Sequence, residues 1–185
     1  GGRRPVRAAE GRLARAGVRR LRELLGLADA AQQAAGAQPA ELSWAGSALG
    51  QALYLSGQAA EARPWLEDLV SQVPASVQPY AVVTALAVLS LIAADQDDPA
   101  AASLARRAVA TAEAHGVNFE PLSGIVYLAL GRAVARQGEL AEAEVQLERA
   151  LQLWDAVPDP DERAGTDLIS LQLSAAQVAA SAGSS

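Results

Sequence analysis

The chain has 185 residues and a formal net charge of −6, and its composition is 51% hydrophobic but only 4% aromatic. It contains no cysteine, which excludes disulfide bonds, thiolate metal sites and a catalytic thiol. No stretch reaches the ~20 apolar residues of a membrane helix, since the longest apolar run, residues 81–94, is interrupted by Thr84 and Ser90. These properties indicate one globular domain, or two, with no membrane segment.

The start of the chain and its amino-acid composition suggest what kind of protein and organism it comes from. It begins Gly1-Gly2 and contains no methionine, so we expect a segment of a longer protein. All 15 basic residues are arginine and alanine is abundant, a bias typical of bacterial genomes rich in G and C. The absence of cysteine and of a signal peptide favours the cytoplasm.

Residues 1–22 hold eight arginines and one glutamate, a net charge of +7, so residues 23–185 carry −6 − 7 = −13. Such a basic arm could contact nucleic acid, it could be a solvated helix face, or it could pair with acidic surface elsewhere in a longer protein. It lacks interleaved aromatic residues, and the acidic remainder would repel phosphates. We therefore predict no direct binding of nucleic acid by this segment, and we assign residues 1–42 as a basic N-terminal helical cap.

Residues 43–76 predict the first pair of helices. Leu49-Gly50 precedes Gly57, which can take the left-handed conformation that ends a helix, and Ala62 and Leu66 follow it. Pro64 lies inside the second helix of this pair, where its missing N–H removes one hydrogen bond and favours a bend.

A weaker copy follows at residues 80–116. Asp97 takes the position of the hinge, and Asp97 or Asp98 can cap the next helix, with Pro99 in its first turn. Leu89 is followed by Ser90 instead of glycine. The second helix has one apolar stripe, formed by Ala101, Leu104, Ala105, Ala108, Val109 and Ala112.

Residues 124–157 repeat the first pattern, with Leu130-Gly131, the hinge Gly138, and then Ala143 and Leu147. The interval from the helix glycine to the hinge is 57 − 50 = 7 in the first copy and 138 − 131 = 7 here, and the next intervals of 5 and 4 also match. The hinges are separated by 97 − 57 = 40 and 138 − 97 = 41 residues. Residues 166–183 are predicted to form a fourth, partial copy of this helical pattern.

The leucine-glycine pair, hinge glycine, small residue, bulky residue and terminal Pro74 resemble the tetratricopeptide repeat, although that repeat has a period of ~34 residues. The longer period resembles the MalT-like repeats of bacterial LuxR-type transcription regulators. The resemblance implies an all-α fold: a right-handed α-solenoid of antiparallel helix hairpins, with roughly three repeats plus capping helices. It also implies a repeat domain over residues 43–185 that binds a protein, a peptide or a small-molecule inducer on its concave face, while other domains bind nucleotide and DNA.

In such repeats the binding positions lie on the first helix of each pair. The resemblance places them in this sequence at Trp44, Ser47, Gln51, Tyr54, Asp95, Arg132 and Arg136.

Two pairs among these positions have a specific interpretation and an alternative. Arg132 and Arg136 share a helix face and could clamp a carboxylate or phosphate, or they could belong to an ordinary solvated or ion-paired face. Trp44 and Tyr54 could stack on a ligand ring or a peptide side chain, or they could be packed in the core or at an interface.

We find no constellation for catalysis or metal binding. Residues 95–98, "DQDD", lack the glycine and final glutamate of a calcium loop, and helix capping explains them better. His115 is the only histidine, and at a helix end it complements the negative dipole. We therefore predict a non-enzymatic protein without cofactor or metal, either the sensing domain of a regulator or a general interaction scaffold.

Overall fold

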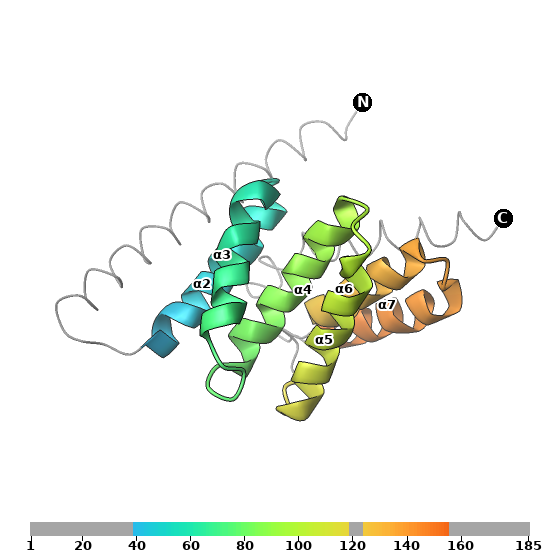
Figure 1. The fold of residues 1–185 in the computed structure, drawn as a ribbon. Helices are drawn as coiled ribbons and strands as arrows, with labels where there is room; N and C mark the ends of the chain where they lie inside the picture. Colours follow the sequence, from blue (N-terminus) through green and yellow to red (C-terminus); the bar gives the residue numbers. More distant parts are fainter. Residues whose placement is uncertain (1–38, 119–123, 156–185) are drawn as a thin grey trace. The chain divides into compact units, whose positions relative to one another are not determined.

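The computed structural model describes residues 39–118 and 124–155 (Figure 1). The regular elements in these two ranges are all α-helices, which confirms the all-α prediction for this part of the chain. The helices are α2 (Pro39–Leu55), α3 (Ala59–Gln72), α4 (Pro79–Asp95), α5 (Ala100–Ala114), α6 (Gly124–Arg136) and α7 (Leu140–Asp155).

The chain divides into two units, residues 1–85 and 86–185, and each is described here by itself. This division falls inside α4, whereas the sequence predicts a domain boundary between residues 42 and 43, which stays a prediction. The arginine-rich residues 1–22 and the partial copy at 166–183 lie outside the described residues.

The first helix of each pair ends in a left-handed turn at the hinge that the sequence predicts, and α5 ends in the same kind of turn at Gly116, with φ +67°. Gly57, Asp97 and Gly138 have φ angles of +83°, +57° and +83°. In each turn, the N–H of the next residue donates to the carbonyl five residues earlier: Gln58 to Leu53, Asp98 to Ala93 and Glu139 to Val134, at 2.8, 2.9 and 3.1 Å. This bond caps a helix that ends in a left-handed residue. The hinge position of Asp97 is therefore confirmed.

In the first unit, α2 packs against α3. A Cβ atom on Gly50 would lie 2.3 Å from the Leu66 side chain, so only glycine allows the two helices to come this close. The Trp65 indole N–H donates to the Gly46 carbonyl at 3.1 Å and ties the same two helices together. Helix α3 continues through Pro64 to Gln72, and a bend at this proline stays a prediction.

In the second unit, α6 packs against both α7 and α5. Gly131 packs against Leu147 in the same way as Gly50 packs against Leu66. A Cβ atom on Gly131 would lie 2.8 Å from the Leu147 Cγ atom. The middle pair uses Ser90 in place of glycine, and its hydroxyl donates to the Ala101 carbonyl at 2.8 Å. Ser90 and the glycines all lie seven residues before their hinges, so a buried hydrogen bond joins α4 to α5 where the other pairs use close packing.

Candidate functional site

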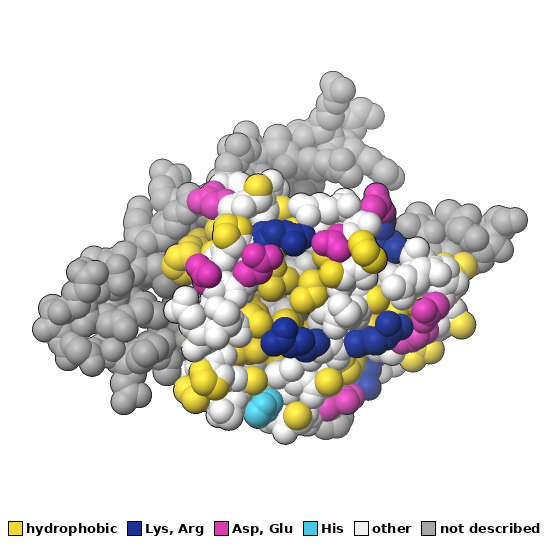
Figure 2. All heavy atoms as spheres, in the orientation of Figure 1, with side chains coloured by type: hydrophobic (Ala, Val, Ile, Leu, Met, Phe, Trp, Pro, Cys, Tyr) yellow, Lys and Arg dark blue, Asp and Glu magenta, His cyan; other side chains and the backbone are white. Residues whose placement is uncertain are grey.

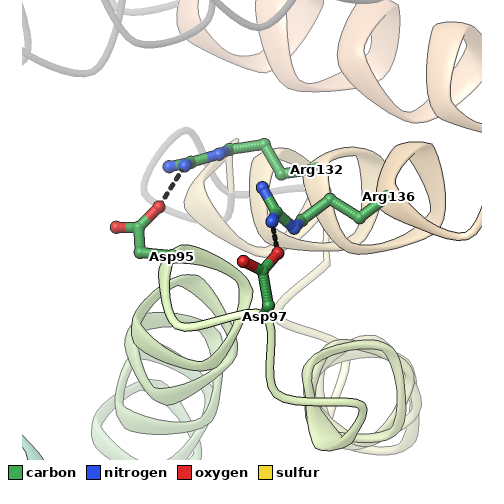
Figure 3. Close-up of polar contacts among 4 residues, drawn as sticks. All are labelled: Asp95, Asp97, Arg132 and Arg136. Atoms are coloured by element: carbon green, nitrogen blue, oxygen red, sulfur yellow. Dashed lines mark hydrogen bonds and ion pairs between the residues drawn. The ribbon is translucent and has the colours of Figure 1, made fainter.

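Four charged side chains from the predicted positions and their surroundings meet in the second unit (Figure 3). Arg132 and Arg136 lie four residues apart on α6 and point toward the turn between α4 and α5. Arg132 pairs with Asp95 at the end of α4, and Arg136 pairs with Asp97 at the hinge. The structure thus joins two residues predicted for binding, Asp95 and Arg132, although they are 37 positions apart in the sequence.

The ion-paired alternative for the two arginines is therefore the arrangement observed. The side chains of Arg132 and Asp95 are 24% and 42% exposed, and those of Arg136 and Asp97 are 47% and 77% exposed. Exposed ion pairs of this kind contribute about 0–1 kcal/mol each, because water and salt screen them. An external anion that bound both guanidinium groups would have to replace the two aspartates.

A third ion pair also joins the α4–α5 pair of helices to the α6–α7 pair. Arg106 of α5 lies 3.5 Å from the carboxylate of Glu139, which occupies the turn before α7. The surface view shows acidic and basic side chains interspersed with hydrophobic ones on the face drawn, rather than gathered in a patch of one sign (Figure 2). Three ion pairs thus join charged groups of the α4–α5 pair to charged groups of the α6–α7 pair.

The other predicted positions lie on α2, in the first unit. Ser47 and Tyr54 are buried, and Gln51 is half-buried. The burial of Tyr54 favours its core-packing alternative, because a ligand could reach the ring only if the surface above it opened. Trp44 belongs to α2, but its side chain lies outside the part that the structure describes.

Sequence reasoning did not assign a site at Tyr127, on α6. Its ring lies beneath the guanidinium of Arg149 from α7, whose Cζ atom is 4.3 Å from the ring centroid. Its hydroxyl is buried and has no hydrogen-bond partner among the described residues. Burial raises the pKa of Tyr127, and Glu113 adds to this rise, while Arg149 and the nearby Asn118 lower it. Asn118 lies near this hydroxyl but makes no hydrogen bond of ordinary geometry with it.

The three aspartates of the acidic run at residues 95–98 have structural roles. Asp95 and Asp97 pair with arginines, and Asp98 caps a helix. The Asp98 carboxylate accepts a hydrogen bond of 2.9 Å from the Ala100 N–H and caps the start of α5. Within residues 39–118 and 124–155, no group of three or more His, Cys, Asp or Glu side chains is placed to hold a metal ion. Among the helices described, none combines the length and apolar character that crossing a membrane requires.

Comparison with protein families, with curated proteins and with solved structures found no match to this chain. The arrangement of its own residues is therefore the basis for a functional proposal.

Proposed function

We propose that this chain is a non-catalytic binding domain of a bacterial transcription regulator, built as a solenoid of tetratricopeptide-like hairpins. Its concave face would take a protein, a peptide or a small-molecule inducer, and binding would shift the regulator between inactive and active assemblies. DNA would be bound by another domain of the full protein, and the domain would work in the cytoplasm without a cofactor.

The observation that carries this proposal is the repeated turn. The first helix of each described pair ends in the same left-handed conformation, at Gly57, Asp97 and Gly138, and these ends lie 40 and 41 residues apart. Repeated hairpins bury their apolar faces against their neighbours, and such arrays serve mainly as extended binding surfaces. The longer period supports the MalT-like type of repeat over the ordinary tetratricopeptide repeat.

Arg136 and Asp95 are exposed among the proposed binding positions that the structure describes, and Arg132 is half-buried. Arg132 and Arg136 present two guanidinium groups on one face, and their present partners are weakly held carboxylates at the surface. Among the proposed positions of the first unit whose side chains the structure describes, Gln51 is partly exposed.

Panning a phage-displayed library of random peptides against the domain tests the proposal. We expect selected peptides to lose at least tenfold in affinity when Arg132→Ala is combined with Arg136→Ala, because a lost charge-assisted contact costs about 1.5–3 kcal/mol. The control pair is Glu144→Gln with Glu148→Gln, on exposed positions of α7. Circular dichroism verifies that both variants keep their helices. Peptides that bind the arginine variant as tightly as the parent would remove these positions from the site.

The alternative is a general protein-interaction scaffold without a regulatory role. The gene sequence on either side of this segment separates the two. A regulator of the proposed class has nucleotide-binding residues before the repeats and a helix-turn-helix after them, whereas a general scaffold has neither.

A further inference from the structure

Helix α3 exposes a large aromatic side chain. It buries Ala62, Leu66 and Leu69, but Trp65 is 46% exposed and is the aromatic member of the large hydrophobic side chains exposed in the described part of the chain. Aromatic side chains are enriched at protein interfaces, where one flat ring provides a large contact area. Trp65 therefore marks the outer face of α3 as a surface for a partner.

The indole ring of Trp65 is held in place by the neighbouring helix. Helices α2 and α3 lie side by side (Figure 1), and the indole N–H donates to the Gly46 carbonyl of α2 at 3.1 Å. A side chain that is already fixed loses little conformational freedom when a partner covers it. The exposed part of the ring is thus prepared for binding as a flat surface.

Two carboxylates flank this ring along the helix. Glu61, Trp65 and Asp68 follow one another at intervals of 65 − 61 = 4 and 68 − 65 = 3 residues, and all three are exposed. Residues at these intervals share one side of a helix. The exposed Glu67 lies beside them and pairs with Arg63 at 3.6 Å. An aromatic ring between two carboxylates attracts a cation, which gains cation–π and charge-assisted contacts together.

Pro64 adds a hydrogen-bond acceptor to the same surface. Because proline has no N–H, the carbonyl of Ala60 lacks the donor that an α-helix supplies four residues later. Ala60 and Pro64 are both exposed, next to Glu61 and Trp65. A guanidinium group is flat and carries several N–H donors, so it can stack on the indole and donate to a carboxylate or carbonyl at once, whereas an ammonium group is a compact point charge. This surface therefore favours arginine over lysine.

The chain itself contains a segment of this chemistry. Residues 1–22 hold eight of the 15 arginines and carry a net charge of +7, against −6 − 7 = −13 for residues 23–185. We propose that Glu61, Pro64, Trp65 and Asp68 form a docking face on α3 for the arginine-rich residues 1–22, with one arginine stacked on the indole ring. The docking face lies on the second helix of its pair. It is therefore separate from the binding positions proposed above, which lie on first helices.

Binding of a labelled synthetic peptide of residues 1–22 tests the proposal. The test protein is the full chain with glutamine in place of the eight arginines of residues 1–22, which leaves the docking face open to the peptide. Fluorescence anisotropy gives the Kd. The parent chain, whose own segment competes for the docking face, should bind the peptide at least fivefold more weakly. Equal binding by the two proteins would overturn the proposal.

The face variant adds Glu61→Gln and Asp68→Asn to the test protein and keeps Trp65. Each exposed ion pair changes an equilibrium constant by at most about fivefold, so the Kd should rise by about two- to twenty-five-fold. Adding Trp65→Leu should raise it by a further two- to fivefold or so, because the aromatic ring is lost.

Helix α7 offers a matched control, since Glu144 and Glu148 are exposed on it together with Val145. Glu144→Gln, Glu148→Gln and Val145→Ala make the same change in net charge and also trim an exposed apolar side chain. This control should bind the peptide as tightly as the test protein does.

A peptide with lysine at the eight arginine positions keeps the charge but loses the planar groups. It should bind the test protein about two- to fivefold more weakly than the arginine peptide. Equal Kd values for the two peptides would overturn the stacking of arginine on Trp65.

An unchanged Kd in the face variant, with circular dichroism also unchanged, would overturn the proposal. An equal rise in the Kd of the α7 control would do the same, because it would mean that net charge alone binds the peptide. If Trp65→Leu loses its helices, the face variant and the lysine peptide decide, since neither changes the bond from Trp65 to Gly46.

Discussion

Leu147 occupies the space in which a side chain on Gly131 would have to lie. A Cβ atom at residue 131 would come within 2.8 Å of the Leu147 Cγ atom and 3.2 Å of the Ala143 carbonyl oxygen. Leu147 is itself fully buried, so it has little room to move away. The close contact between α6 and α7 thus depends on the absence of one methyl group.

Gly131→Ala should lower the free energy of unfolding by about 1–3 kcal/mol, because overpacking outweighs the gain of about 1 kcal/mol in helix propensity. Urea denaturation measures this change. In a double-mutant cycle with Leu147→Ala, the space vacated by the leucine should accept the new methyl group. The cost of Gly131→Ala should then disappear in the Leu147→Ala background. A Gly131→Ala protein as stable as the parent would contradict the packing described for α6 and α7.

Asp97→Gly should have opposing effects that nearly cancel. Glycine removes the steric cost of a positive φ, about 1 kcal/mol, but it also removes the ion pair with Arg136, worth about 0.2–1 kcal/mol. In the Arg136→Ala background the ion pair is already lost, so the same substitution should stabilise by the full amount. Thermal or urea denaturation of the four proteins gives the difference. Equal effects of Asp97→Gly in both backgrounds would mean that the ion pair contributes nothing to stability.

Tyr127→Phe should leave the protein as stable as the parent, or stabilise it by up to about 1 kcal/mol, since an unsatisfied buried hydroxyl costs about 1–3 kcal/mol. The phenyl ring keeps its place beneath Arg149. Urea denaturation measures the stability of each protein. Tyr127→Leu loses the ring and should be clearly less stable than both the parent and Tyr127→Phe. A loss of more than about 1 kcal/mol in Tyr127→Phe would show that the hydroxyl does have a partner in solution.

Alkaline pH should destabilise the protein through the same residue. Burial raises the pKa of Tyr127 above its ordinary value of 10.0, because the charged phenolate is disfavoured in the core. Below that value the folded and unfolded chains both keep the proton, so the contribution to stability is constant. Above it the unfolded chain loses the proton first, and stability falls as pH rises toward the folded pKa.

The slope cannot exceed about 1.4 kcal/mol per pH unit for this one group. Urea denaturation between pH 9 and 11 should show a steeper decline in the free energy of unfolding for the parent than for Tyr127→Phe. Parallel declines in the two proteins would mean that Tyr127 titrates normally.

The helices and their ends could be read from the sequence because the signals are local. An apolar stripe repeats within a single helix, and a glycine or aspartate can take the left-handed conformation where the helix stops. Gly57 and Gly138 follow from this reasoning directly, and Asp97 follows from its place between them at matching intervals. The sequence also shows that Gly50 and Leu66 have the same spacing as Gly131 and Leu147, the two pairs that are in contact in the structure.

The candidate site could be read only in part, since its partners come from different helices. Spacing placed Arg132 and Arg136 on one face, but it could not show that Asp97 pairs with Arg136, because side chains far apart in sequence meet only through helix packing. The same holds for the burial of Ser47 and Tyr54, which an amphipathic pattern does not distinguish from partial exposure.

The sequence by itself therefore determined the helical class, the hinges and the small residues that let the helices approach, all of which depend on neighbouring residues along the chain. Only the tertiary structure decided that Ser90 bonds to α5, that Tyr127 lies under Arg149, and that the two arginines already hold carboxylates. These contacts depend on distances between helices, which the periodicity of one helix does not contain.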